Sequence, residues 1–275
     1  MYSGISKGEQ MEGKHRDWMG SGWGASLVTA VLLSAMPSAE AEVTEKYVSP
    51  DKTFSVSIDG DALVYRGLLL ADGVDRAEKY LSDHPSLTVL AIASGGGDIE
   101  AGMKLGDLVL ARAMDVRVFQ FCGSSCANYV FVSGRRKIIE PGAVVMWHGS
   151  PLRPENIAVN ATVVDTAGKS TTTHYEGEAL LEYLKRPNIA PGIESDRQRQ
   201  LEFFERRKVD GRVTVHGHEI GCQCQWTFTL DDMQRFGIKD VQPDSSYPWP
   251  ASLEAENTTL LRIEHAAAED PGFQD

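Results

Sequence analysis

The chain has 275 residues, enough for one domain or at most two small ones, and its apolar fraction of 42% is ordinary for a globular protein. Its formal net charge is −12 at pH 7, and the sequence carries no stripe of lysine and arginine interleaved with aromatic residues. Nucleic acids and anionic membrane surfaces are therefore not expected as partners.

The first 41 residues have the three parts of a secretory signal peptide. Basic residues precede an apolar run from Trp23 to Met36, and Ala39-Glu40-Ala41 fits a cleavage site after Ala41. The run is shorter than the roughly 20 apolar residues that a spanning helix needs, so we expect no membrane span after cleavage. We therefore assign 1–41 to the signal peptide and expect a periplasmic or secreted protein, with a buried first helix as the alternative.

Strand and helix patterns alternate through the first half of the mature chain. Strands are predicted at Thr53–Ile58, Leu87–Ala93, Val116–Phe121, Arg136–Ile139 and Ala143–Trp147, and helices at Leu68–Leu81, Asp98–Leu110 and Ala127–Val132. Gly102 and Gly106 lie one turn apart in the second helix, which predicts close packing against a neighbour. This βαβ series predicts an α/β fold with a mostly parallel sheet and right-handed crossovers.

The pattern is looser in the second half of the chain. Ser150 to Thr173 is polar and rich in threonine, with little periodicity. Helices are predicted at Tyr175–Lys185, Ser195–Arg207 and Leu230–Phe236, and strands at Arg212–His216 and Ile238–Val241. Residues 243–275 read as a loose tail, so we expect a single folded domain over 42–242.

Two turns between a strand and a helix carry most of the chemical information. Ser94-Gly95-Gly96-Gly97-Asp98 follows one buried strand, and Cys122-Gly123-Ser124-Ser125-Cys126 follows the next. Backbone N–H groups at a helix start have no partner within the helix, and Asp98 suits the N-cap. One turn can therefore bind a developing oxyanion and the other can present a serine, while His148, after a later strand, can take the proton. This is the outline of a serine hydrolase.

The same stretches resemble a known family. Ser94 to Met103 is similar to the Ser-Pro-Gly-Gly-x-x-x-Ala-Gly-Met segment of the proteolytic subunit of the Clp protease and its ClpP/crotonase-like relatives. Ser125 to Gly134 resembles the family's nucleophile turn, Val144 to His148 the segment that ends in the catalytic histidine, and Gly237 to Asp240 a later Gly-Leu-x-Asp motif. The Cys122-x-Ser-x-Cys126 pattern is nearest to an exported, periplasmic ClpP-like subgroup.

The resemblance implies a fold, a reaction and a role for each of these residues. The fold is a ClpP/crotonase-like spiral of βαβ units, often assembled as a homo-oligomer, and the reaction is serine-dependent hydrolysis of a peptide or other acyl substrate without a cofactor. Ser125 is the expected nucleophile from its spacing to Gly134, and Ser124 is the alternative because the serine of the Cys-x-Ser-x-Cys pattern falls there. His148 is the expected base, and the oxyanion donors are Gly96, Gly97 and Cys126.

The third member of a catalytic triad is the weakest part of this prediction. Counting back from Gly237, the family's aspartate falls near Gln225. A glutamine can hold a histidine tautomer, but it cannot stabilise the imidazolium by charge, and loss of the acid costs on the order of ten-thousandfold in a well-studied triad. Glu219 and Asp231 are other candidate acids. A catalytically inactive ClpP-like scaffold or binding protein is thus the alternative function, and export argues against acyl-CoA chemistry of the crotonase type.

The four cysteines allow three disulfide pairings, and the sequence does not choose among them. An exported protein meets an oxidising compartment that permits disulfides. His216, His218, Cys222 and Cys224 have the ligand types of a tetrahedral zinc site. Their spacing matches no zinc finger that we know, however, so we expect a disulfide there and no metal.

Overall fold

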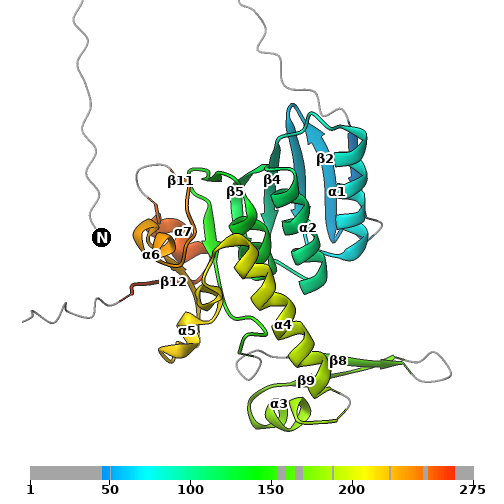
Figure 1. Ribbon diagram of the computed structural model, residues 1–275, viewed down its shortest axis with the longest axis vertical. Helices are drawn as coiled ribbons and strands as arrows, with labels where there is room; N and C mark the ends of the chain where they lie inside the picture. The colour runs from blue at the N-terminus through cyan, green and yellow to red at the C-terminus, as the bar shows by residue number, and fades with distance from the viewer. Residues whose placement is uncertain are drawn as a thin grey trace, which may run out of the picture. The chain divides into compact units, whose positions relative to one another are not determined.

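A mostly parallel sheet is the centre of the fold (Figure 1). The computed structural model describes residues 45–49, 51–153, 159–164, 170–187, 189–222, 224–243 and 247–263. Within these residues, eight strands form the sheet: β1 (Glu45–Val48), β2 (Phe54–Asp59), β3 (Ala62–Gly67), β4 (Val89–Ser94), β5 (Asp115–Gly123), β6 (Lys137–Ile139), β7 (Val144–Met146) and β11 (Val241–Pro243).

The strand order is β1-β2-β3-β4-β5-β6-β11, and β7 also pairs with β5. The pairs β1–β2 and β2–β3 are antiparallel, and all other pairs in this sheet are parallel. The protein is therefore a mixed α/β fold, as the alternation of strands and helices predicts. The antiparallel strands β1 and β3 were not predicted from the sequence.

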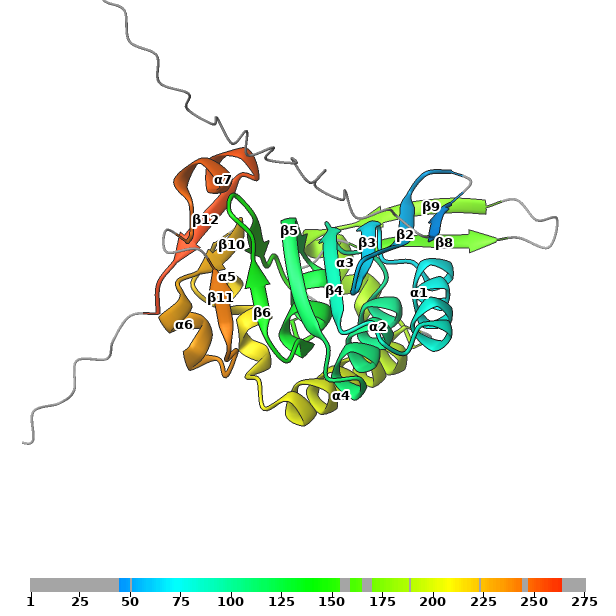
Figure 2. The ribbon, with the colours of Figure 1, turned by 90° about the horizontal axis from the view of Figure 1, so that it is seen from above.

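Two helices lie side by side on one face of this sheet, α1 (Ala71–Asp83) and α2 (Ile99–Ala111) (Figure 2). Each buries an apolar stripe, which includes Val74 and Leu81 in α1 and Leu105 and Val109 in α2. The predicted N-cap of the second helix is confirmed, because the Asp98 carboxylate accepts the Ala101 N–H at 2.8 Å.

Close packing at the two glycines of α2 is also confirmed. The neighbour is a π-helical turn, η1 (Cys126–Val130), which continues into the 3₁₀ turn η2 (Phe131–Ser133). A Cβ at Gly102 would lie 2.9 Å from the Tyr129 ring, and one at Gly106 would lie 2.5 Å from the Tyr129 carbonyl oxygen. Only glycine lets η1 approach α2 this closely.

The polar region after His148 contains more structure than its pattern predicts. An antiparallel hairpin, β8 (Val159–Val164) and β9 (Ser170–Tyr175), falls within the stretch for which we expected little periodic structure. The helices α3 (Gly177–Leu184) and α4 (Ala190–Arg207) follow close to their predicted positions. Phe203 and Phe204 of α4 are buried against Tyr129, which ties α4 to the turn after β5.

Two expectations for the last third of the chain are corrected. The stretch Arg212–His216, expected as a strand, forms the 3₁₀ turn η4 (Gly211–Thr214) and the start of α5 (His216–Glu219). Its β-branched residues suggested a strand, but the Asp210 carboxylate caps the turn by accepting the Arg212 N–H at 2.9 Å.

The expected loose tail is ordered over 247–263. After β10 (Gln225–Phe228) and α6 (Leu230–Arg235), this segment forms α7 (Pro250–Ala255) and β12 (Thr258–Leu261). Strand β12 pairs in parallel with β10, so the domain continues beyond residue 242. Residues 264–275 and the expected signal peptide at 1–41 lie outside the described residues. No helix in the described part of the chain is long and apolar enough to cross a bilayer.

The buried carboxylate of Asp115, at the start of β5, gives a test of the fold. Burial would raise the pKa of Asp115, but hydrogen bonds and charge from Arg136 and Arg135 outweigh it and lower the pKa from 3.8 to about 2. The carboxylate therefore stabilises the fold above pH 4, and its contribution is lost as the pH falls towards 2.

We expect Asp115→Asn to lower the free energy of unfolding at pH 7 by about 2 kcal/mol and to have a smaller effect at pH 3. Urea unfolding at both pH values measures this difference. Asp61→Asn, at an exposed carboxyl, is the matched control. Equal losses at the two pH values would contradict the role assigned to the ion pairs.

Candidate active site

The two turns identified in the sequence meet at one edge of the sheet. Ser94, at the end of β4, pairs with Cys122 of β5, which in turn pairs with Val145 of β7. The Ser124 N–H donates to the Met146 carbonyl at 3.2 Å, two residues before His148. The carboxyl ends of the three parallel strands thus deliver the glycine turn, the serine turn and the histidine to the edge where α/β proteins usually bind ligands.

The glycine turn is held by a short bridge to Leu69. The Leu69 N–H donates to the Gly96 carbonyl at 2.9 Å, and the Leu69 carbonyl accepts the Asp98 N–H at 2.8 Å. In such a parallel bridge the N–H and carbonyl of the intervening residue, Gly97, face the opposite edge. The Gly97 carbonyl accepts the Ser125 hydroxyl at 2.9 Å, and no described residue accepts the Gly97 N–H. This N–H therefore faces the serine turn.

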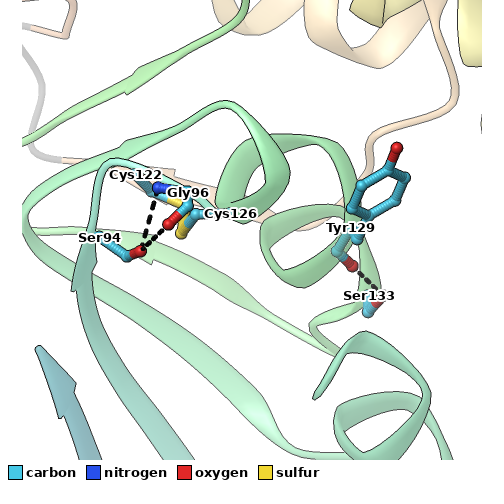
Figure 3. Close-up of a disulfide and its surroundings, with 6 residues drawn as sticks. All are labelled: Ser94, Gly96, Cys122, Cys126, Tyr129 and Ser133. Atoms are coloured by element: carbon cyan, nitrogen blue, oxygen red, sulfur yellow. Dashed lines mark hydrogen bonds between the residues drawn. A yellow bond between two sulfur atoms is a disulfide. The ribbon is translucent and has the colours of Figure 1, made fainter. Parts of the chain in front are cut away.

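Gly96 brings the two turns into contact. Its φ of +98° lies in the left-handed region, and a Cβ there would lie 2.6 Å from the Ser124 Cβ and 2.8 Å from the Ser125 nitrogen. The Gly96 N–H donates to the Ser94 hydroxyl at 3.1 Å (Figure 3). Because the Gly96 N–H is already bonded, Gly97 is the one of these two predicted oxyanion donors whose N–H is left for a ligand.

A disulfide closes the serine turn. Cys122, the last but one residue of β5, bonds Cys126, the first residue of η1, and both are fully buried (Figure 3). The other two cysteines pair with each other, as Cys222–Cys224. Of the three pairings that the sequence allows, the structure thus has the one with two local links. The first link confines the backbone of Gly123, Ser124 and Ser125.

Ser124 occupies the strained position of this turn. Its φ of +52° is uncommon for a residue other than glycine, and its side chain is partly exposed. No residue in the described part of the chain hydrogen-bonds its hydroxyl. Such strain collects at functional sites, and a serine on a sharp strand-to-helix turn is typical of hydrolase nucleophiles.

Ser125 has a different environment. It is 3% exposed, and a Cβ at Gly102 of α2 would lie 3.1 Å from its own Cβ. Its hydroxyl donates to the Gly97 carbonyl, so this proton is engaged in a bond between the two turns. The Ser125 hydroxyl therefore links the serine turn directly to the glycine turn.

The number of residues between Ser125 and Gly134, which favoured Ser125 as the nucleophile, depends on the geometry of the helix between them. That count of nine residues back from Gly134 assumes a regular α-helix. A π turn closes its hydrogen bonds from i to i+5, so it contains one residue more than the same length of α-helix. The 3₁₀ turn η2 that follows contains fewer residues for its length than an α-helix, so the two turns offset each other and the count does not choose between Ser124 and Ser125.

His148 lies on the rim of a hollow of about 440 Å³. The other lining residues are His218, Cys224, Gln225 and Asn257. Although His148 is exposed, desolvation by the surrounding protein lowers the pKa of its imidazole, an effect that its own backbone partly opposes. The neutral ring, which can accept a proton, is therefore favoured at neutral pH.

Gln225 lines the hollow together with His148. It stands near the position at which the family pattern places the acid of the catalytic triad. Trp147 and Trp226 form an antiparallel bridge and exchange both backbone hydrogen bonds, at 2.7 and 2.8 Å. His148 follows Trp147 and Gln225 precedes Trp226, and both residues line the same hollow. The Gln225 amide nitrogen donates to the Glu256 carbonyl at 3.1 Å, which leaves its amide oxygen as an acceptor.

The other two candidate acids do not line this hollow. Glu219 is paired with Arg212 and Arg153, and the hydrogen bond from Arg212 lowers its pKa. Asp231 is exposed in the first turn of α6. At the suggested zinc ligands, Cys222 and Cys224 are bonded to each other, and no group of three or more metal-binding side chains occurs among the described residues.

Asn257 and Leu69 belong to the site but were not identified from the sequence. Asn257 lines the hollow from the segment that we expected to be a loose tail, and its φ is +47°. The apolar and β-branched residues of 258–261 that follow it are a weak strand signal. Leu69 contributes only its backbone, for which the sequence gives no signal.

Because the two turns are in contact at Gly96, a single methyl group added there should strongly destabilise the protein. Gly96→Ala should lower the free energy of unfolding by roughly 2 kcal/mol or more, because the new Cβ meets backbone and Cβ atoms at a left-handed φ. Gly95→Ala is the matched control, because its Cβ would meet only the Phe121 ring, at 3.8 Å. It should change stability by less than about 0.5 kcal/mol. Similar losses in both variants would contradict the close approach at Gly96.

The similarity to known proteins lies among solved structures. No family model matches the chain, and no curated protein matches it. Among solved structures, the chain is similar to a mutant of ClpP1 from Listeria monocytogenes, with 14% sequence identity and a TM-score of 0.41 over 68% of this chain and 92% of that chain. A similarity of this size does not assign the chain to a family.

Proposed function

We propose that this chain is an exported serine hydrolase with a ClpP/crotonase-like fold and peptidase-like chemistry, in which Ser124 is the nucleophile. One observation carries the proposal: Ser124 is partly exposed, has a left-handed backbone and lies against Gly96. Ser125, the nucleophile favoured by spacing alone, is buried and its hydroxyl is bonded to Gly97.

The reaction needs only residues of the chain. The Ser124 oxygen attacks an acyl carbon while His148 accepts the hydroxyl proton, and the carbonyl electron pair moves to the oxygen. The N–H groups of Gly97 and Ser125 then stabilise this oxyanion, since neither has a partner among the described residues. With Ser125 as the nucleophile, as the sequence predicts, the second N–H would come from the next residue, Cys126. The protonated His148 passes its proton to the leaving group, and water reverses the sequence to release the acid.

Gln225 takes the place of the triad acid in this proposal. Its amide oxygen is free of the bond to Glu256 and can accept a hydrogen bond from an N–H of the His148 ring, which holds one tautomer. An uncharged amide does not stabilise the imidazolium that forms during the attack. We therefore expect slow turnover compared with a complete triad.

Export, substrate class and assembly belong to the proposal as well. The signal-like N-terminus and two disulfides fit an oxidising compartment, so we propose a periplasmic or secreted location. The substrate class is a peptide or other acyl compound, and the family resemblance favours a homo-oligomer. The alternative, an inactive scaffold or binding protein, is favoured by one observation, the glutamine at position 225.

A fluorophosphonate probe, which labels activated serines covalently, separates these functions. Wild-type protein should be labelled, and Ser124→Ala should abolish labelling. Ser125→Ala should slow labelling only about five- to tenfold, the equivalent of one lost hydrogen bond to the glycine turn. His148→Ala should slow it by roughly 10²- to 10⁴-fold. Folded wild-type protein that is not labelled would favour the scaffold, and loss of labelling in Ser125→Ala alone would return the nucleophile to Ser125.

The pH dependence of labelling follows from the pKa of His148. Since burial lowers this pKa below its usual 6.5, the neutral base should already predominate at pH 7. The labelling rate should rise with pH through a midpoint below 6.5 and then reach a plateau. Second-order labelling rates between pH 4.5 and 8.5 measure this, and a midpoint above 7 would contradict His148 as the base.

A further inference from the structure

We propose that Asn128 is a positioning residue that holds the His148 segment at a fixed distance from the turn that presents Ser124. This inference rests on the proposed function, because it assigns Asn128 a role in the same reaction. Asn128 lies in the π-helical turn η1, four residues after Ser124. It does not line the hollow beside His148 and is not expected to contact a substrate.

Asn128 is bonded to both halves of the site. Its backbone N–H donates to the Ser124 carbonyl at 2.8 Å, and its side-chain Nδ2 donates to the Gly149 carbonyl at 3.1 Å. One residue therefore joins the carbonyl of the proposed nucleophile to the carbonyl of the residue after the proposed base. The side chain is 2% exposed, so water does not compete for this bond.

Burying the Asn128 amide costs free energy, which indicates that this side chain is present for its hydrogen bond to Gly149. The amide must face Gly149 with its nitrogen, because a carbonyl accepts and does not donate. Its oxygen Oδ1 is then buried without a hydrogen-bond partner among the described residues. A leucine of similar size would fill the space without an unmatched acceptor, so packing alone does not explain an asparagine here.

The histidine segment depends on this bond because of its local backbone. Trp147 is fixed by its bridge to Trp226, and the Ser150 hydroxyl lies 2.7 Å from that of Thr214. Between them, Gly149 has a φ of +130°, which a glycine can readily leave. The Asn128 amide holds this glycine from the side of the serine turn. Without it, His148 should drift relative to Ser124 while the fold stays intact.

The test compares Asn128→Leu with Tyr129→Phe in the full chain, using the fluorophosphonate probe. Tyr129→Phe is the matched control, because it removes another buried hydrogen bond of the same turn, the 2.8 Å bond to Gln200 of α4, which lies away from His148. Thermal unfolding and circular dichroism establish that each variant is folded. We expect Asn128→Leu to slow labelling by ~100-fold, as for a displaced catalytic group, and Tyr129→Phe to slow it by less than about threefold.

A double-mutant cycle with His148→Ala gives a readout that a purely structural role would not produce. If Asn128 acts through His148, then Asn128→Leu together with His148→Ala should label no more slowly than His148→Ala alone. In the Asn128→Leu variant the labelling rate should also no longer rise with pH, because that rise depends on His148. Additive effects, or an unchanged pH profile, would overturn the inference.

The remaining outcomes also decide the matter. If wild-type protein is not labelled, the proposed function fails and this inference fails with it. If wild-type protein is labelled and Asn128→Leu is labelled equally fast, only the inference about Asn128 fails. Asn128→Ala is the second variant in case Asn128→Leu does not fold. If neither variant folds, Asn128 is required for the fold itself and the positioning role is overturned.

Discussion

The contact between two strand-end turns determines the arrangement of the whole site. The disulfide Cys122–Cys126 closes one turn, and Gly96 of the other lies against Ser124 at a distance that no side chain would permit. Strands β4 and β5, the bridge from Leu69 and the close packing of α2 on η1 all hold these turns together. A covalent link is well suited here, because it confines a backbone that is strained at Ser124.

The two adjacent serines have different environments. Ser125 is 3% exposed, and its hydroxyl donates to the Gly97 carbonyl. Ser124 is partly exposed, and its backbone is bonded to Met146 on one side and to Asn128 on the other. The histidine segment is in turn held by Asn128, Trp226 and Thr214. Gln225 lines the hollow beside His148, where the sequence predicts the acid of a catalytic triad to be missing.

Much of this arrangement could be predicted from the sequence, because strong local signals encode it. Apolar runs placed β4 and β5, Asp98 capped α2, and Gly102 and Gly106 predicted the close approach of η1. The order of the two turns and His148 then indicated the site. Gln225 was likewise expected beside the histidine, and the Trp147–Trp226 bridge brings it there.

The features that the sequence did not reveal depend on tertiary contacts. A π turn followed by a 3₁₀ turn has no simple signature, so the irregular helix after β5 could not be predicted from the sequence. The β-branched run at 213–215 became a 3₁₀ turn because Asp210 caps it, and 258–261 became a strand because β10 offers an open edge. Bonds such as Asn128 to Gly149 join residues 21 positions apart, and no local pattern encodes them.

Mapping the covalent adduct on wild-type protein tests the assignment of the nucleophile most directly. After reaction with a fluorophosphonate and proteolysis, tandem mass spectrometry separates fragment ions that break the chain between Ser124 and Ser125. The expected result is one adduct, with its added mass on Ser124 and an unmodified Ser125. An adduct on Ser125, or on a serine elsewhere in the chain, would contradict the role given to the strained turn.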